Sequence, residues 1–229
     1  MSVGDAIDPA VELMIFDCDG VLIDSEVIST RAAVGALAAI GYDIDEDEAL
    51  RRFVGRTYAS MRRQVEADMG RPLPPSFSDD LERSTLEIMA TDLQPIAGVG
   101  AILEELDLPR CVASSSSLAW IRQGLETTGL IDHFEPHLFS ASMVERGKPA
   151  PDIFLHAAKE MGVAPARTLV VEDSEAGVLA GVAAGATVIG FTGGSHVVEA
   201  DHAARLLELG ARRVIDDMAT LPRLLDEGM

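Results

Sequence analysis

The stretch LMIFDCDG, residues 13–20, decides the fold. Its four consecutive apolar residues, Leu13 to Phe16, predict a strand buried on both faces, as in the parallel sheet of an α/β protein. The strand ends abruptly at two aspartates, Asp17 and Asp19, and Gly20 allows the chain to turn there. A turn at this point can direct both carboxylates toward one target, although an Asp-x-Asp pair alone is also common on solvated loops.

The same pattern recurs twice along the chain. The apolar run 111–113 leads into the serines 114–117, and the run 169–171 leads into Glu172 and Asp173. A helical pattern follows each run, which predicts βαβ units in a parallel sheet. Ligands of such sheets bind at the carboxyl ends of the strands, so we expect these polar residues to meet at one edge. Further strands are predicted at Leu138–Ser140, Thr187–Phe191 and Arg213–Ile215.

A long helical insertion is predicted after the first strand. Between Ser25 and about Asp92 no strand-like run occurs and helical spacing of apolar residues dominates. Pro72, Pro74 and Pro75 are expected to divide this segment into two pairs of helices.

The composition excludes several partners. Eighteen basic against 38 acidic residues give a net charge of −20, which repels nucleic acid and anionic membranes. A phosphate substrate would therefore need a metal and a few well-placed cations. Cys18 and Cys111 are too few for a disulfide framework, so we expect a reducing cytoplasm, with Cys18 a buried spacer. Neither a signal peptide nor an apolar run of about 18 residues is recognisable.

Four carboxylates predicted at one sheet edge imply a divalent cation. Unpaired, the group Asp17, Asp19, Glu172 and Asp173 would raise its own pKa values and destabilise the fold. Oxygen ligands without clustered imidazoles favour magnesium over zinc. The histidines lack metal-ligand spacing and are expected to be surface or capping residues: His133, His137, His156, His196 and His202.

Two further segments are candidates for binding an anion. Lys148, the first lysine of the chain, lies in the stiff loop 147–152; it is either a surface lysine or a phosphate ligand, and its place before a predicted helix favours the latter. Serines 114–117 could form a linker, but they directly follow a buried strand, where hydroxyl and amide groups can donate to phosphoryl oxygens. Trp120 is expected in the core, and residues 192–195 in a simple turn.

In this order the motifs resemble those of the haloacid dehalogenase superfamily of phosphohydrolases. The resemblance rests on residues 17–26 (DCDGVLIDSE), Ser114, residues 148–152 (KPAPD) and residues 172–177 (EDSEAG), and it covers nearly the whole chain. It is closest to the β-phosphoglucomutase and sugar-phosphate phosphatase branch, including phosphatases of phosphogluconate-like compounds. The resemblance implies a Rossmann-like catalytic core of residues 1–25 and 93–229, with a helical cap of residues 26–92.

The resemblance also implies roles for individual residues. Asp17 would be the nucleophile, Asp19 the general acid and later the base, and Ser114 and Lys148 would hold the phosphoryl group. Mg²⁺ would be bound by Asp17, the Asp19 carbonyl and Asp173, with Glu172 binding directly or through water. The residues expected to contact substrate are Gly20, Glu26, Ser115, Ser116 and Arg56, the last being equally compatible with a solvated helix end.

The positions at which this chain differs from the patterns of individual branches of the superfamily indicate which branch it resembles. Haloacid dehalogenases lack the second aspartate and need no metal, and phosphonate hydrolases use a cap lysine, whereas no lysine precedes Lys148. Where the mutases have a histidine and an arginine, this chain has Ser29 and Tyr58, so water should be the acceptor. We therefore expect a Mg²⁺-dependent phosphatase of a small sugar, polyol or sugar-acid phosphate. It would be a cytoplasmic monomer or weak homo-oligomer without nucleic-acid or membrane partners. A phosphomutase and a non-catalytic phosphate-binding regulator remain as alternatives.

Overall fold

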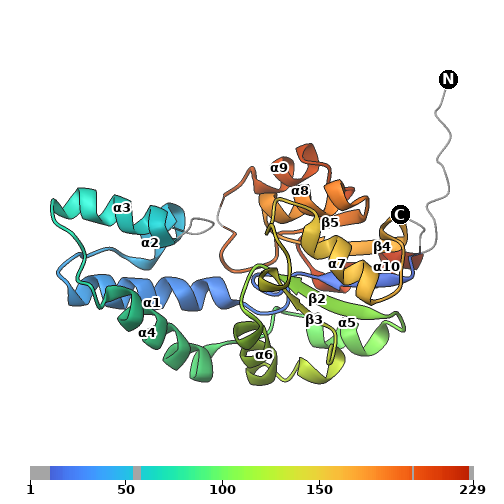
Figure 1. The fold of residues 1–229 in the computed structure, drawn as a ribbon, viewed down its shortest axis with the longest axis horizontal. Coiled ribbons are helices and arrows are strands. Elements are labelled where there is room, and N and C mark those ends of the chain that lie inside the picture. Colours follow the sequence, from blue (N-terminus) through green and yellow to red (C-terminus); the bar gives the residue numbers. More distant parts are fainter. Residues whose placement is uncertain (1–10, 54–57, 198, 227–229) are drawn as a thin grey trace.

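The computed structural model describes residues 11–53, 58–197 and 199–226. Within them the chain forms a parallel six-stranded sheet in the order β3-β2-β1-β4-β5-β6, flanked by helices (Figure 1). The strands are β1 Leu13–Phe16, β2 Arg110–Ser114, β3 Leu138–Ser140, β4 Thr168–Glu172, β5 Thr187–Phe191 and β6 Arg213–Ile215. The α/β class and all six predicted strands are confirmed, with β2 and β4 extended by one residue at each end.

Alternation along β1 divides the core into two layers. Met14 and Phe16 belong to an apolar cluster that also includes residues of α5 (Val99–Glu105), α6 (Leu118–Thr127) and α10 (Leu221–Asp226). Leu13 and Ile15 belong to a second cluster, with residues of α7 (Asp152–Glu160), α8 (Glu175–Ala184) and α9 (His202–Glu208). Because successive side chains of a strand point to opposite faces, a run of four apolar residues serves both layers.

The strand register brings the functional segments together. Phe16 lies opposite Val112 of β2 on one side and Val171 of β4 on the other. The backbone N–H of Asp17 donates to the Val171 carbonyl at 3.0 Å. The segments that follow β1, β2 and β4 therefore leave the sheet at the same edge, as the sequence predicts.

Four of the described helices come between β1 and α5 in the chain and lie beside the sheet (Figure 1). They are α1 Ser25–Ala39, α2 Glu46–Phe53, α3 Tyr58–Met69 and α4 Phe77–Asp92, and we refer to them as the helical segment. This segment has its own apolar cluster, which includes Leu37, Val65 and Phe77.

The predicted division of the helical segment into two pairs of helices is wrong. Three of the described helices precede the prolines at 72–75, and one follows them. The first break comes at Gly41, whose φ of +83° ends α1, and α4 then continues unbroken for 16 residues beside α1. Packing against a long neighbouring helix thus makes a second break after the prolines unnecessary.

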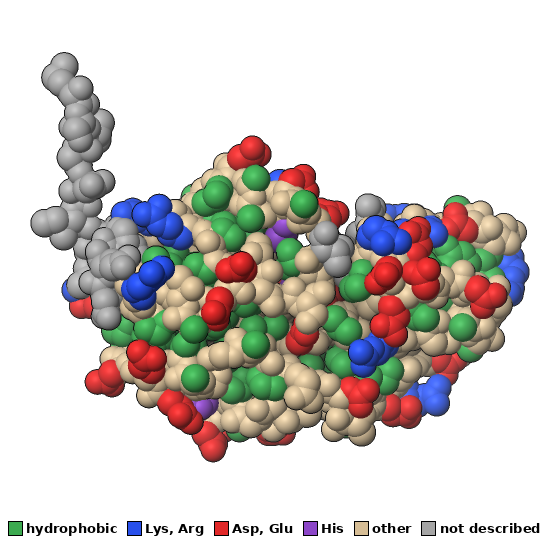
Figure 2. Space-filling view, turned by 180° about the vertical axis from the view of Figure 1, so that it is seen from behind, with side chains coloured by type: hydrophobic (Ala, Val, Ile, Leu, Met, Phe, Trp, Pro, Cys, Tyr) green, Lys and Arg blue, Asp and Glu red, His purple; other side chains and the backbone are tan. Residues whose placement is uncertain are grey.

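The surface reflects the acidic composition. On the face shown in Figure 2, acidic side chains are dispersed over both the sheet-containing part and the helical segment rather than gathered in one patch. None of the helices in the described part of the chain is long and apolar enough to cross a membrane.

Candidate active site

A buried lysine joins two carboxylates at the carboxyl edge of the sheet. Lys148 Nζ donates to Asp17 Oδ1 and to Glu172 Oε1, each at 2.6 Å, and the three side chains are 4%, 9% and 0% exposed. Asp17 follows β1, Glu172 ends β4, and Lys148 lies in the loop between β3 and α7. Three distant parts of the chain thus form one buried charged group.

The electrostatics of this group are set by burial. Burial raises the pKa of Asp17 well above its usual range, and Lys148 opposes that shift. For Lys148, burial alone would lower the pKa, but the neighbouring Asp17 and Glu172 raise it above the usual lysine value. The ammonium therefore stays charged at neutral pH, and it is a fixed cation for an anionic ligand.

The acidic residues at this edge could hold a metal ion. One oxygen each of Asp17, Glu172 and Asp173 lies within 4.8 Å of the others, and all three residues are buried. Lys148 and the His196 imidazole beside Asp173 supply at most two positive charges for three buried carboxylates, and a divalent cation with a preference for oxygen ligands fits the remaining negative charge. Glu172 Oε2 already accepts from the Ser174 amide and hydroxyl at 2.8 and 2.9 Å, so Asp17 and Asp173 are the less engaged ligands.

Two glycines make room for this cluster. Gly20 has φ +78°, and a Cβ there would lie 2.1 Å from Asp173 Oδ2. At Gly177, in α8, a Cβ would lie 1.7 Å from Glu172 Oε1. Neither carboxylate could occupy its position beside a larger residue, so the glycines of these motifs have steric roles. Gly20, which the sequence predicts at the substrate, lies buried against Asp173.

Asp19 is held by a different set of donors. Its Oδ1 accepts from Ser25 Oγ at 2.5 Å and from the Trp120 indole N–H at 2.8 Å. Its Oδ2 accepts from Ser116 Oγ at 2.6 Å and Ser114 Oγ at 3.4 Å. Both oxygens are therefore oriented by named side chains. The expectation for Trp120 is only half right, because its half-buried ring packs against the core while its N–H reaches Asp19.

An open cleft of about 990 Å³ surrounds these groups. Ser115, the most exposed of the predicted serines, lies on its wall, and Arg51 of α2 reaches it from the helical segment. The other predicted residues on its wall are Asp17, Asp19, Glu26, Ser114, Ser116, Lys148 and Asp173. Glu172 is completely buried, and Arg56 lies outside the described residues.

Two histidines contact Asp173; the expectation of a surface or capping residue is wrong for His196, whereas His202 is half-buried at the start of α9. His196 Nε2 lies 3.0 Å from Asp173 Oδ2, with the imidazole 9% exposed, and His202 Nε2 lies 2.7 Å from the Asp173 carbonyl oxygen. The loop after β5 folds over this site, and Ser195 Oγ donates to Asp24 Oδ2 at 2.5 Å. The sequence contains one signal for this loop: it follows a predicted strand, β5, and the carboxyl ends of parallel strands are where the other motifs of the site were predicted.

A second cavity of about 440 Å³ adjoins the cleft. Glu26, Ser29 and Trp120 line both spaces, so they mark the junction. The rest of the cavity wall is mostly apolar and comes from the helical segment, including Ala33, Ala49, Phe53, Met61, Leu81 and Leu86. Burial raises the pKa of Glu26 to about 7, and the neighbouring Asp19 adds to the shift.

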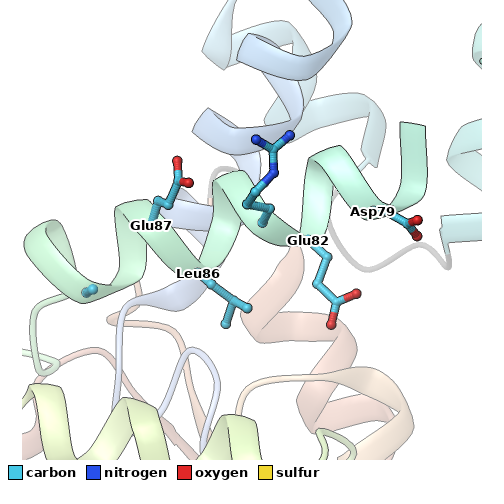
Figure 3. A pocket seen from close by; sticks show the side chains of 6 residues that line it. Asp79, Glu82, Leu86 and Glu87 are labelled. Carbon is cyan, nitrogen blue, oxygen red and sulfur yellow. The ribbon is translucent and has the colours of Figure 1, made fainter. Parts of the chain in front are cut away.

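A third hollow runs along α4 and has a different character. About 500 Å³ of space is lined by six residues of this one helix, including the carboxylates of Asp79, Glu82 and Glu87 (Figure 3). Three carboxylates against the one guanidinium of Arg83 make this wall unfavourable for phosphate, and among the described residues only α4 contributes to it. The cleft at the sheet edge is therefore the better candidate for phosphate chemistry.

Known proteins resemble this chain in sequence and in fold. The chain is 32% identical over 187 residues to 6-phosphogluconate phosphatase of Escherichia coli K12, with 81% of this chain and 85% of that protein covered. A solved haloacid dehalogenase-like protein of unknown function from Agrobacterium tumefaciens C58 superposes with a TM-score of 0.86 at 42% identity, covering 95% of this chain and 98% of that one. A family hydrolase from Deinococcus radiodurans R1, solved with bound phosphate and sodium, has a TM-score of 0.83 at 33% identity, covering 96% and 97%.

The match to the family itself is extensive. The haloacid dehalogenase-like hydrolase model matches residues 11–185, which include every motif on which the sequence resemblance rests. The chain therefore belongs to the haloacid dehalogenase-like hydrolases.

Proposed function

We propose that the protein is a Mg²⁺-dependent phosphatase that hydrolyses a small sugar, polyol or sugar-acid phosphate through a phosphorylated Asp17. The observation that carries this proposal is the buried Lys148 that binds Asp17 at 2.6 Å, beside an acidic group large enough to need a metal. The family and its phosphatase-named relatives make the chain a phosphoric monoester hydrolase.

In the first step, an oxygen of Asp17 forms a bond to phosphorus while the bond to the ester oxygen breaks. Asp19 gives a proton to the departing oxygen. In the second step Asp19 takes a proton from water, the water oxygen attacks the aspartyl phosphate, and inorganic phosphate leaves with Asp17 restored. Lys148 and the hydroxyl of Ser114 would stabilise the phosphoryl oxygens in both steps.

The metal site would be formed by Asp17, Asp173 and the Asp19 carbonyl, with Glu172 anchoring Lys148 or binding through water. Oxygen ligands of this kind suit Mg²⁺, which when bound would neutralise charge on the phosphoryl group. The chain's contribution is to hold these oxygens in place, through Gly20 and Gly177 and through the histidines that contact Asp173.

The substrate class follows from the relatives and from the helical segment. We propose that residues 26–92 act as a cap over a core of residues 1–25 and 93–229. The relative from Escherichia coli is named a 6-phosphogluconate phosphatase, which suggests a sugar or sugar-acid phosphate. Ser29 and Tyr58 line the adjoining cavity at the positions where mutases have a histidine and an arginine. A hydroxyl and a phenol bind a second phosphate group more weakly than a histidine and an arginine do. This favours water as the acceptor of the phosphoryl group.

The test is Asp17→Asn, assayed with p-nitrophenyl phosphate and with 6-phosphogluconate, each with Mg²⁺ and with excess chelator. We expect the wild type to need Mg²⁺, and the variant to lose at least about 10⁴-fold in kcat while its circular dichroism is unchanged. Mass spectrometry of rapidly quenched wild-type enzyme should find phosphate on the peptide that contains Asp17. Turnover by the variant, or an unphosphorylated peptide in an active wild type, would refute the mechanism.

A further inference from the structure

Trp120 occupies the junction between the two cavities and has no part in the chemistry described above. Its indole Nε1 donates to Asp19 Oδ1 at 2.8 Å, across 101 positions of sequence. Its backbone N–H donates to Ser117 Oγ at 3.2 Å, which fixes the start of α6 and therefore the base of the side chain. Trp120 is therefore held at its backbone by Ser117 and at its indole N–H by Asp19, so it can orient the Asp19 carboxyl group.

The two oxygens of Asp19 have unequal partners. Oδ1 accepts from Ser25 and Trp120, whereas Oδ2 accepts from Ser114 and Ser116. A serine hydroxyl can turn and either donate or accept, but an indole N–H can only donate. When Asp19 carries a proton, the serines can reverse their roles and Trp120 cannot. The N–H facing Oδ1 is better matched by a carbonyl oxygen than by a hydroxyl, which favours the proton on Oδ2.

We propose that Trp120 is a positioning residue for Asp19, which keeps Oδ1 as the acceptor so that Oδ2 delivers the proton to the leaving ester oxygen. This inference rests on the proposed function of Asp19 as the general acid. Oδ2 is the oxygen beside Ser114 and Ser116, at the end of β2 where the phosphoryl group is expected. As the phosphorus–ester bond breaks, its electron pair goes to the leaving oxygen, which takes the Oδ2 proton while Asp17 bonds to phosphorus.

The consequence is a dependence on the leaving group. An alkyl phosphate releases a strongly basic alkoxide unless it is protonated, so its cleavage needs a well-oriented acid. A p-nitrophenyl phosphate releases an acidic phenol, which leaves without that proton. Loss of the indole N–H should therefore slow alkyl esters selectively, whereas a general disturbance of the site would slow both.

The single tryptophan of the chain makes a clean replacement possible. Growth with the sulfur isostere of tryptophan, benzothienylalanine, changes position 120 alone and replaces its N–H donor by sulfur. Trp120→Phe is the genetic counterpart. Phosphoryl transfer to Asp17 is measured in single turnovers by rapid quench. We expect about a tenfold lower rate with an alkyl phosphate and less than about a twofold change with p-nitrophenyl phosphate.

The same replacements are then made in the Asp19→Ala background, where they should have no further effect on the alkyl ester. Equal losses with both esters, no loss with either, or a further loss without Asp19 would overturn the inference. If Asp19→Ala itself leaves alkyl phosphate turnover intact, Asp19 is not the general acid, and the inference about Trp120 is refuted as well. If Asp19→Ala slows the alkyl ester and the tryptophan replacements do not, this inference alone falls.

Discussion

Ion pairs are buried at the sheet edge and exposed in the helical segment. At the edge, the side chains of Lys148, Asp17 and Glu172 are less than 10% exposed, and the lysine lies at hydrogen-bonding distance from both carboxylates. In the helical segment, ion pairs such as Arg51 with Glu48 have side chains about half exposed. Buried charges must be paired or bound to metal, whereas exposed pairs contribute little stability.

The difference indicates that the two regions have different functions. Strand ends fixed by a hydrogen-bonded sheet can hold reacting groups at defined separations, which phosphoryl transfer requires. The helical segment instead presents an apolar cavity that adjoins the cleft at Ser29 and Glu26. We infer that the edge performs the chemistry and the helical segment selects the leaving group, and three substitutions test that comparison.

The largest effect is expected at the edge, for Lys148→Ala. The substitution removes the ammonium that would stabilise the phosphoryl oxygens, so we expect kcat to fall by about 10²- to 10³-fold in assays with p-nitrophenyl phosphate. It also leaves two buried carboxylates with one partner fewer, so the midpoint of thermal unfolding should fall.

The chain supplies its own control, because Lys159 is the only other lysine and it is exposed near the end of α7. Lys159→Ala should leave both kcat and the unfolding midpoint close to the wild-type values. Similar effects of the two substitutions would mean that the burial of Lys148 has no catalytic significance.

An intermediate effect is expected at the junction, for Glu26→Gln. The pKa of Glu26 is raised from its ordinary 4.5 to about 7 in the folded protein. The folded state therefore binds more protons than the unfolded state between these values, and its stability falls as the pH rises through that range. Removing the charge should raise the free energy of unfolding by about 3 kcal/mol at pH 8, and by much less at pH 5.

Urea unfolding in the absence of divalent metal measures this difference. Glu87→Gln on α4 is the matched control, because that side chain is exposed and its substitution should give no pH-dependent gain. A constant difference between pH 5 and pH 8 for Glu26→Gln would contradict the assignment of a half-buried carboxyl group with a raised pKa at this position.

The smallest effect is expected in the helical segment, for Ser29→Leu. The added bulk at the junction should raise the KM for 6-phosphogluconate by up to about tenfold, because the leaving group must pass this position. Inhibition by inorganic phosphate needs only the edge and should be unchanged. Ala38 is exposed on the same helix, so Ala38→Leu should alter neither the KM nor the inhibition by phosphate. Weaker inhibition by phosphate in Ser29→Leu would show that the helical segment also affects phosphate binding at the edge.

The sequence alone determined the sheet and the residues at its edge. Runs of apolar residues that stop at polar ones identify buried parallel strands, and the geometry of a parallel sheet then requires their carboxyl ends to meet. The strand ends identify Asp17 and Asp173 as neighbours, whereas Lys148 is identified by its stiff loop before a helix and by the family resemblance. The prediction from the strands was possible because the strand signal is local, and because the distance between strands is fixed by hydrogen bonds rather than by side-chain packing.

Only the tertiary structure decided which side chains support those residues. The carboxyl end of β5 marks the loop that contains His196 but not the contact that the histidine makes, and a tryptophan on a helix such as Trp120 is compatible with many surroundings. Their contacts with Asp173 and Asp19 depend on how the loop after β5 and helix α6 pack against the sheet. The arrangement of the helical segment was equally hidden, because helix breaks depend on the length of the neighbour that a helix packs against as well as on its prolines.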